Sequence, residues 1–367
     1  MDFNSFLSSA ALANLSRDSA RDQIPSNLDL TRAAALEISR DSYLEAESRG
    51  LTLSELLETE EYDPSPLGSP LDAFERQLAL AGVRLAGRQP TSVEQFYQKA
   101  PALLPEFMLR ELKKGQQMRP ELNKLIASST VINSNRYTPF FIDTASTGKF
   151  SLRPVGEGAE IPQLIVTEQT HAITVGDFGL TLKTSYRALR HRSTAQFRVL
   201  LWYIGFKMQT DKIGMIVNTI INGDGNANSA KVVNAAATGA LTYADLVTLW
   251  SQFAPFEMTT LVCHIDKLKT ILNLSEFKDP LIGYRFQQQG DLINPLGSTL
   301  VRSDEVPTDY VIGLDNRFAI EEVIAQPLMI EYDKVIEQRF EEAVISEAVA
   351  YAKIVKDAAI ILDTVFS

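Results

Sequence analysis

The stretch IINGDGNANS (220–229) holds the residue types that most resemble a binding site, with two glycines around a carboxylate and amide side chains after them. A calcium loop that starts at Asp224 needs glycine at its sixth position and an acid at its twelfth. Ser229 and Ala235 stand there, so the calcium pattern fails. A dinucleotide loop has to follow a strand and open a helix, whereas these glycines follow a predicted helix. The stretch therefore predicts a helix terminator and a turn, and no metal site.

Residues suited to acid–base or nucleophilic chemistry are few and scattered along the chain. The histidines and the cysteine are His171, His191, His264 and Cys263. Adjacent strand residues point to opposite faces, so Cys263 and His264 cannot easily share a metal or a proton. No HExxH, CxxC or GxSxG motif occurs, and the acidic pairs Glu321–Glu322 and Glu341–Glu342 are typical of solvated surfaces. We expect no enzyme and no cofactor, and the alternative is a soluble α+β enzyme with an unrecognised site.

One stretch is strongly basic. From 183 to 212 the chain has seven Lys/Arg and a single acid, Asp211. In a helix these side chains would occupy at least two faces, and two interpretations remain open. The helix either is solvated and pairs with acidic neighbours, for example from the acidic N-terminal region, or it presents a basic strip to DNA or to an acidic partner. The candidates for such a strip are Arg187, Arg190, Arg192 and Arg198.

Composition narrows the class of protein. The chain has 367 residues, 45% of them hydrophobic, and a formal net charge of −11. That content suffices for a sizeable core, and the charge makes the surface as a whole repel nucleic acid. A single cysteine excludes an internal disulfide, and its apolar flank suggests a buried thiol in a reducing cytoplasm. The N-terminus lacks a signal-peptide pattern and no segment could span a membrane, so we expect a soluble cytoplasmic product.

The elements that must position these residues follow from the hydrophobic pattern. Positions 1–115 predict amphipathic helices separated by breakers, an extended arm rather than a compact domain. Thr52 and Glu55 offer a capping box there. Positions 136–182 predict a long β-hairpin with a polar, glycine-rich tip, and Tyr186 to Ile221 predict a long helix, with Leu200 among its recurring apolar positions. A mixed central region follows, and the chain is β-rich from Pro327.

Four stretches carry a resemblance to a known family. VGEGAEIPQLIVTEQTHAITVGDFGLTLKTSYRAL (155–189) resembles the extended loop and spine-helix entry of tailed-phage major capsid proteins of the Hong Kong 97 fold. DKIGMIVNTIINGDGNANS (211–229) resembles their spine helix and its closing turn. Positions 261–320 resemble the axial domain, and AVAYAKIVKDAAIIL (348–362) resembles the closing strand of the peripheral domain. The resemblance covers roughly Thr91 to the C-terminus.

The resemblance implies an α+β capsid fold with six segments. These are an N-terminal helical arm (1–115), an arm-to-core connection of the peripheral domain (116–135), the extended loop (136–182), the spine helix and peripheral domain (183–240), the axial domain (241–326) and closing strands of the peripheral domain (327–367). By the same resemblance, the extended loop would lie over a neighbouring subunit and the axial loop would meet its copies at the capsomer axis.

The implied function is self-assembly into pentamers and hexamers of an icosahedral virion shell around double-stranded DNA. Assembly would take place in the host bacterial cytoplasm, with portal and decoration or scaffolding proteins as further partners and no membrane. The implied intersubunit contacts are Lys149, Arg153, Glu157, Glu160, Lys278, Asp279, Arg285, Gln288 and Asp291. An encapsulin-like compartment is the alternative shell. Some relatives join a hairpin lysine to an asparagine of another subunit; Lys149 is suitably placed, but no partner can be assigned, so we expect no crosslink.

Overall fold

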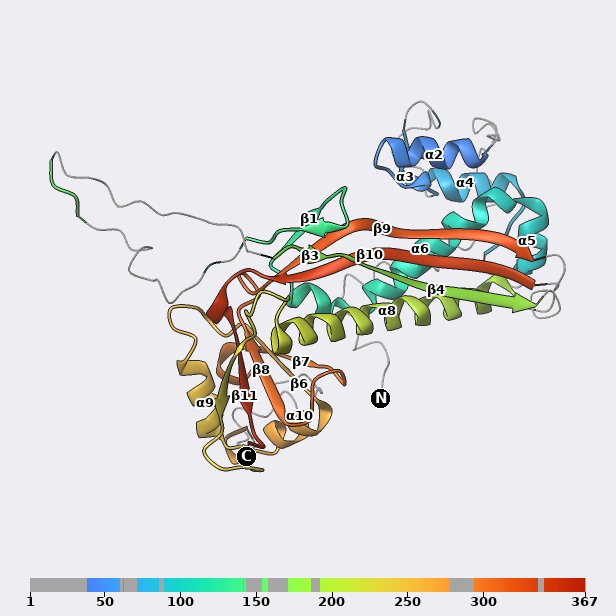
Figure 1. Cartoon of the computed structure of the whole chain (residues 1–367). Helices are drawn as coiled ribbons and strands as arrows, with labels where there is room; N and C mark the ends of the chain where they lie inside the picture. The colour runs from blue at the N-terminus through green and yellow to red at the C-terminus, as the bar shows by residue number, and fades with distance from the viewer. Residues whose placement is uncertain are drawn as a thin grey trace. The chain divides into compact units, whose positions relative to one another are not determined.

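The fold is taken from a computed structural model (Figure 1), which describes residues 38–59, 62, 71–85, 89–140, 142, 154–157, 171–185, 192–277, 294–335 and 340–366. Helices and strands both contribute throughout, so the α+β class is confirmed. The chain divides into two compact units. The first unit comprises Met1–Gly115, Gly179–Gly205 and Met329–Ile345, and the second comprises Gln116–Phe178, Phe206–Leu328 and Ser346–Ser367.

The first unit is built around short helices. They are α2 (Arg40–Ser48), α3 (Leu53–Leu57), α4 (Ala73–Leu80), α5 (Val93–Lys99), the 3-10 turn η3 (Pro101–Leu103) and α6 (Leu104–Gln117). The capping box at α3 is confirmed, because Thr52 and Glu55 bond each other's backbone N–H. Serine, threonine or aspartate begins the helices α2 to α5 in the same way, and such caps satisfy N–H groups that the helix itself leaves unpaired.

These helices share a core, which corrects the expectation of an extended arm. Leu56, Phe74, Phe96 and Phe107 are each at most 2% exposed, and the rings of Phe96 and Phe107 lie 5.3 Å apart. The amphipathic pattern correctly indicated an apolar stripe on each helix. It did not indicate that the stripes of successive helices cover one another, which is the physical reason for the correction.

A four-stranded sheet has the order β1-β9-β10-β4. Its strands are β1 (Ser128–Val131), β4 (Gly176–Ser185), β9 (Ile320–Val335) and β10 (Phe340–Lys353). The base of the predicted hairpin is present, because β2 (Arg136–Tyr137) pairs antiparallel with β3 (Ile173–Thr174). The return strand β4 takes β10 as its neighbour instead of the outgoing arm of the hairpin. The predicted tip at 148–162 lies outside the described residues except for 154–157.

The long helix is α8 (Thr194–Asn222), 29 residues long. It begins later than the predicted Tyr186, because Arg192 and Ser193 precede it in non-helical conformation. Its C-terminal part belongs to the second unit, where Ile213, Ile216 and Ile220 are at most 1% exposed. The 3-10 turn η4 (Pro120–Lys124) contributes Leu122 to the same cluster.

The second unit contains a five-stranded sheet with the order β5-β11-β8-β6-β7. The elements of this part are β5 (Lys231–Asn234), α9 (Tyr243–Ser251), β6 (Thr260–Cys263), α10 (Ile265–Leu272), η6 (Ser275–Phe277), η7 (Pro295–Gly297), β7 (Thr299–Arg302), β8 (Tyr310–Leu314), η9 (Lys356–Ala358) and β11 (Ala359–Asp363). Neighbouring residues face opposite sides of the sheet. Thus Ile361 joins the cluster with α8, and Ile360 joins the cluster with α9 and α10.

The strand pairings of β11 were not predicted from the sequence. Residues 327–367 were expected to form closing strands of one peripheral domain. β11 pairs with β5, from the predicted segment 183–240, on one side and with β8, from the predicted axial segment 241–326, on the other. Ala359, Ile360, Ile361 and Leu362 are all at most 1% exposed. A strand that is apolar on both faces needs cover on both, and the centre of this sheet provides it.

Candidate functional site

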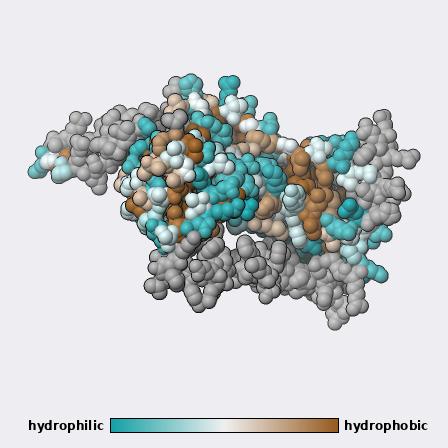
Figure 2. Space-filling model, turned by 90° about the horizontal axis from the view of Figure 1, so that it is seen from below, coloured by the Kyte–Doolittle hydropathy of each residue, from teal (hydrophilic) through white to brown (hydrophobic). Residues whose placement is uncertain are grey.

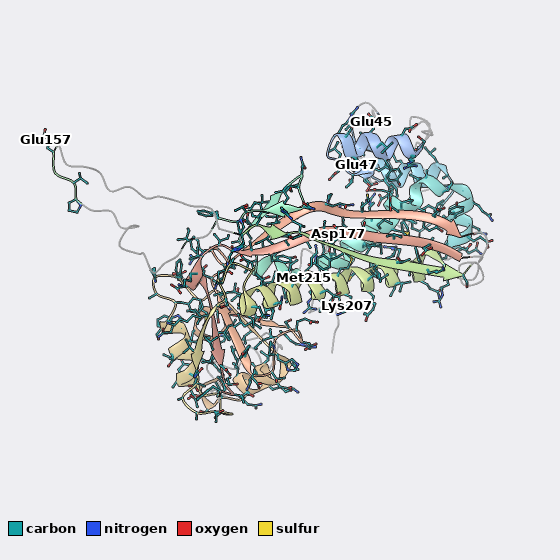
Figure 3. The ribbon with its side chains drawn as sticks, in the orientation of Figure 1. Glu45, Glu47, Glu157, Asp177, Lys207 and Met215 are labelled. Carbon is teal, nitrogen blue, oxygen red and sulfur yellow. The ribbon has the colours of Figure 1, made fainter. Side chains whose placement is uncertain are left out.

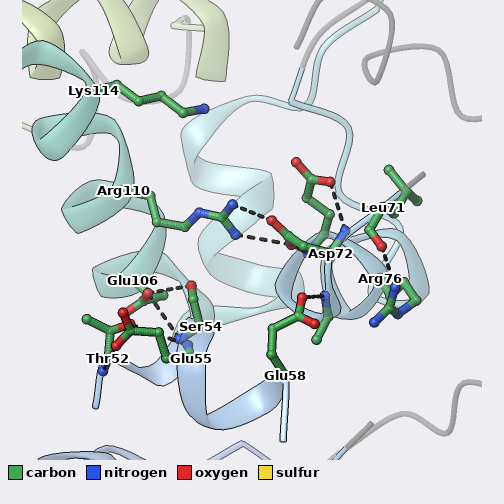
Figure 4. A network of polar contacts seen from close by, with 12 residues as sticks. Thr52, Ser54, Glu55, Glu58, Leu71, Asp72, Arg76, Glu106, Arg110 and Lys114 are labelled. Atoms are coloured by element: carbon green, nitrogen blue, oxygen red, sulfur yellow. Dashed lines mark hydrogen bonds and ion pairs between the residues drawn. The ribbon is translucent and has the colours of Figure 1, made fainter. Parts of the chain in front are cut away.

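Buried charges in the first unit tie its helices together (Figure 4). Glu106 on α6 is 2% exposed and accepts hydrogen bonds from the backbone N–H and the hydroxyl of Ser54 on α3. Arg110 on α6 forms an ion pair with Asp72, the N-cap of α4. Burial, and then the Glu106 carboxylate, raises the pKa of Tyr43. These acids have structural partners, so we assign them to helix packing.

Glu111 connects α6 with the N-terminal half of α8 inside the first unit. Its carboxylate is 3% exposed. Oε2 accepts from Arg198 Nε at 3.2 Å and Trp202 Nε1 at 2.6 Å, and Oε1 accepts from Lys114 Nζ at 3.2 Å. The Arg198 guanidinium also lies over the Trp202 ring. Arg198 therefore pairs with an acid of the N-terminal region, although its side chain is only 11% exposed rather than solvated.

The predicted turn after α8 is confirmed. Gly223 and Gly225 have φ of 80° and 94°, conformations that favour glycine. Asn228 Oδ1 accepts from the backbone N–H of Asp224 at 3.0 Å, and Asp224 Oδ1 accepts from that of Asn226 at 3.2 Å. The other oxygen, Oδ2, accepts from the backbone N–H of Lys353 at 3.2 Å. The carboxylate that suggested a metal site therefore fastens the turn to the end of β10.

The remaining candidates for chemistry also have structural surroundings. Burial raises the pKa of Cys263 to about 12, which keeps the thiol protonated. His264 is the N-cap of α10 and accepts from the backbone N–H of Asp266. Glu321 accepts from Tyr137 and Thr130. Within the described ranges, no group of three or more His, Cys, Asp or Glu could hold a metal ion, and no described helix is long and apolar enough to cross a membrane.

The N-terminal half of α8 exposes a row of large apolar side chains. Val199, Leu200 and Tyr203 are 59%, 42% and 67% exposed. Their spacing places them on one face of the helix, and we call these three residues the α8 stripe. Figure 2 shows brown apolar side chains gathered in patches on the face of the molecule that is seen from below. Farther along the helix the outer face becomes polar, with an ion pair between Lys207 and Asp211 at 2.7 Å.

Few of the predicted contact residues are placed by the structure. Glu157 is exposed, and Figure 3 shows no described helix or strand beside it. Arg192 is exposed just before α8, and its backbone carbonyl accepts from the N–H of Val93. The others lie outside the described residues: Lys149, Arg153, Glu160, Arg187, Arg190, Lys278, Asp279, Arg285, Gln288 and Asp291.

Sequence reasoning missed the α8 stripe and placed Leu200 among the recurring apolar positions of the helix. The run FRVLLWYIGF (197–206) is apolar around most of the helix, so no single buried face stands out in it. The signal that could have revealed the stripe is the excess of apolar residues over what one buried helix face requires. A helix with apolar residues all round needs cover on all sides.

Comparisons with known proteins complete the description. No family model and no curated protein sequence matches the chain. Similar solved structures include a virus-like particle from Pyrococcus furiosus, with 12% identity over 71% of this chain and 99% of that chain and a TM-score of 0.49. The capsid of Cyanophage P-SCSP1u has 12% identity over 65% and 86% of the two chains and a TM-score of 0.48.

An encapsulin is similar as well. The holo-SrpI encapsulin complex from Synechococcus elongatus has 14% identity over 78% of this chain and 95% of that chain, with a TM-score of 0.44. The resemblance to phage capsid proteins that the sequence indicated is thus found again among solved structures.

Proposed function

We propose that this chain is the subunit of a closed protein shell. The observation that carries the proposal is the α8 stripe, in which Val199, Leu200 and Tyr203 stand exposed side by side. Adjacent large apolar side chains on a surface are typical of protein contacts. The buried acids of the first unit, Glu106 and Glu111, are used in packing, which favours a protein that acts by association over one that acts by catalysis.

The particular shell that we propose is the icosahedral head of a tailed phage, in which pentamers and hexamers enclose double-stranded DNA. The family resemblance of the sequence supports this choice. In the proposed shell, the charges at Lys149, Arg153, Glu157 and Glu160 pair with neighbouring subunits. Exposed ion pairs contribute only about 0–1 kcal/mol each, so stability comes from apolar area and from the many contacts that a closed shell repeats.

Electron microscopy of the purified chain after size-exclusion chromatography tests this proposal. We expect closed shells or capsomer rings, and particles isolated from the native host should contain DNA that resists nuclease. Shells that hold protein cargo and no protected DNA would indicate an encapsulin-like compartment instead. A homogeneous monomer at every salt and protein concentration would contradict a shell of either kind and return the enzyme alternative to consideration.

A further inference from the structure

The α8 stripe needs a specific covering element, and α2 offers a second exposed apolar face. On α2 and just beyond its end, the outward positions include Leu44, Glu47 and Leu51, spaced three and four residues apart. Leu44 is 52% exposed and Leu51 is 36% exposed. The opposite side of the helix is used within the subunit, since Ala46 is buried and the Tyr43 hydroxyl donates to the carbonyl of Ala102 at 2.6 Å.

The two faces belong to segments of opposite charge. Positions 38–62 hold seven Asp/Glu and two Lys/Arg, whereas positions 183–205 hold five Lys/Arg and no acid, and of these five Arg198 is already paired with Glu111 inside the subunit. Glu47 is exposed on α2 (Figure 3), and Arg192 is exposed next to the start of α8. Opposite charges around apolar contacts favour the correct pairing and accelerate encounter. Like-charged pairing of α8 with α8, or of α2 with α2, is disfavoured for the same reason.

The two faces cannot meet within one subunit. Inside the first unit, α2 lies at the upper edge in Figure 1 and the N-terminal half of α8 at the lower edge. Tyr43 and the buried Ala46 hold α2 against the other helices of this unit, away from the stripe. A second copy of the chain can bring its own α2 to the stripe without any rearrangement.

We propose that α2 of one subunit packs on the α8 stripe of the next, with Leu44 and Leu51 against Val199, Leu200 and Tyr203. This inference rests on the proposed shell function and names one of its interfaces. The contact joins two different surfaces, so it repeats head to tail, and contacts of this kind close into rings when the rotation between copies allows it. The covering helix α2 lies in the first 90 residues, which the family resemblance does not cover.

Two complementary variants of the full-length chain test this contact. L44E damages only the α2 face and V199E damages only the stripe, and each introduces a carboxylate where apolar cover is required. We expect neither variant to assemble by itself. In an equimolar mixture, the intact α2 of V199E fits the intact stripe of L44E, so native mass spectrometry should detect a one-to-one heterodimer that weakens as salt is raised.

The matched control is V232E, which introduces the same change at a valine on β5 that is 49% exposed. It should behave as the wild type, and thermal unfolding should show all three variants folded. Assembly of V199E alone at the wild-type level, or no heterodimer in the mixture, would overturn the inference. If the wild type forms shells and the mixture gives no heterodimer, only this interface is wrong. If the wild type also stays monomeric, the shell function falls with it.

Discussion

At the scale of single residues, Glu111 is a buried carboxylate that joins two helices of the first unit. One carboxylate, 3% exposed, serves three donors on α6 and α8. Truncation leaves the Arg198 guanidinium, whose side chain is 11% exposed, without this counter-charge. We expect E111A to lower the free energy of unfolding by roughly 3 kcal/mol, measured by urea unfolding. E47A, the same change at an exposed glutamate, should have little effect, and equal losses in the two variants would contradict this role.

Lys353 is a buried charged residue whose Nζ, unlike the Glu111 carboxylate, has no hydrogen-bond partner among the described residues. Lys353 is 0% exposed. Burial lowers its pKa from 10.5 to about 8, although the Asp357 and Asp224 carboxylates act in the other direction. Between these two pKa values the unfolded chain binds more protons than the folded chain, so stability rises with pH across that window. Below it, the folded state bears a cost of roughly 3 kcal/mol.

Replacement of Lys353 by methionine removes the buried charge and keeps the volume of the side chain. We expect K353M to raise the urea midpoint at about pH 7 and to abolish the rise in stability towards about pH 10. The control is K269M, at a lysine whose side chain is 66% exposed; it should leave both values unchanged. A wild type with the same stability on both sides of the window would show that Lys353 does not titrate in this way.

At the scale of elements, the approach of α6 to α8 depends on Gly115. A Cβ at this position would lie 2.3 Å from the backbone oxygen of Trp202, a contact that requires the helices to separate. We expect G115A to cost about 1–3 kcal/mol of stability, seen as a lower midpoint of thermal unfolding. Gly156 has nothing within 4 Å and serves as the control through G156A. Unchanged unfolding of G115A would mean that α8 tolerates a shift away from α6.

The elements also show how far sequence reasoning reaches. The helix around 194–222, its glycine turn and the cap at Thr52 were predictable, because each depends on residues close together in the chain. The elements against which each helix or strand packs could not be predicted. The place of β11 between β5 and β8, and the shared core of the N-terminal helices, depend on distant segments. The candidate site was missed because an apolar run does not reveal which of its faces the subunit leaves uncovered.

At the scale of the whole molecule, the proposed shell needs many weak contacts and no covalent ones. The α8 stripe offers apolar area worth roughly 25 cal/mol per Å² when it is covered, and a closed shell repeats that gain at every subunit. We therefore expect purified shells, boiled in denaturant, to run as a single band at 40.7 kDa. As a control, shells treated with a lysine-reactive crosslinker should show a ladder of covalent multimers on the same gel. A ladder in untreated shells would contradict this, and its loss in K149R would identify Lys149 as the linking residue.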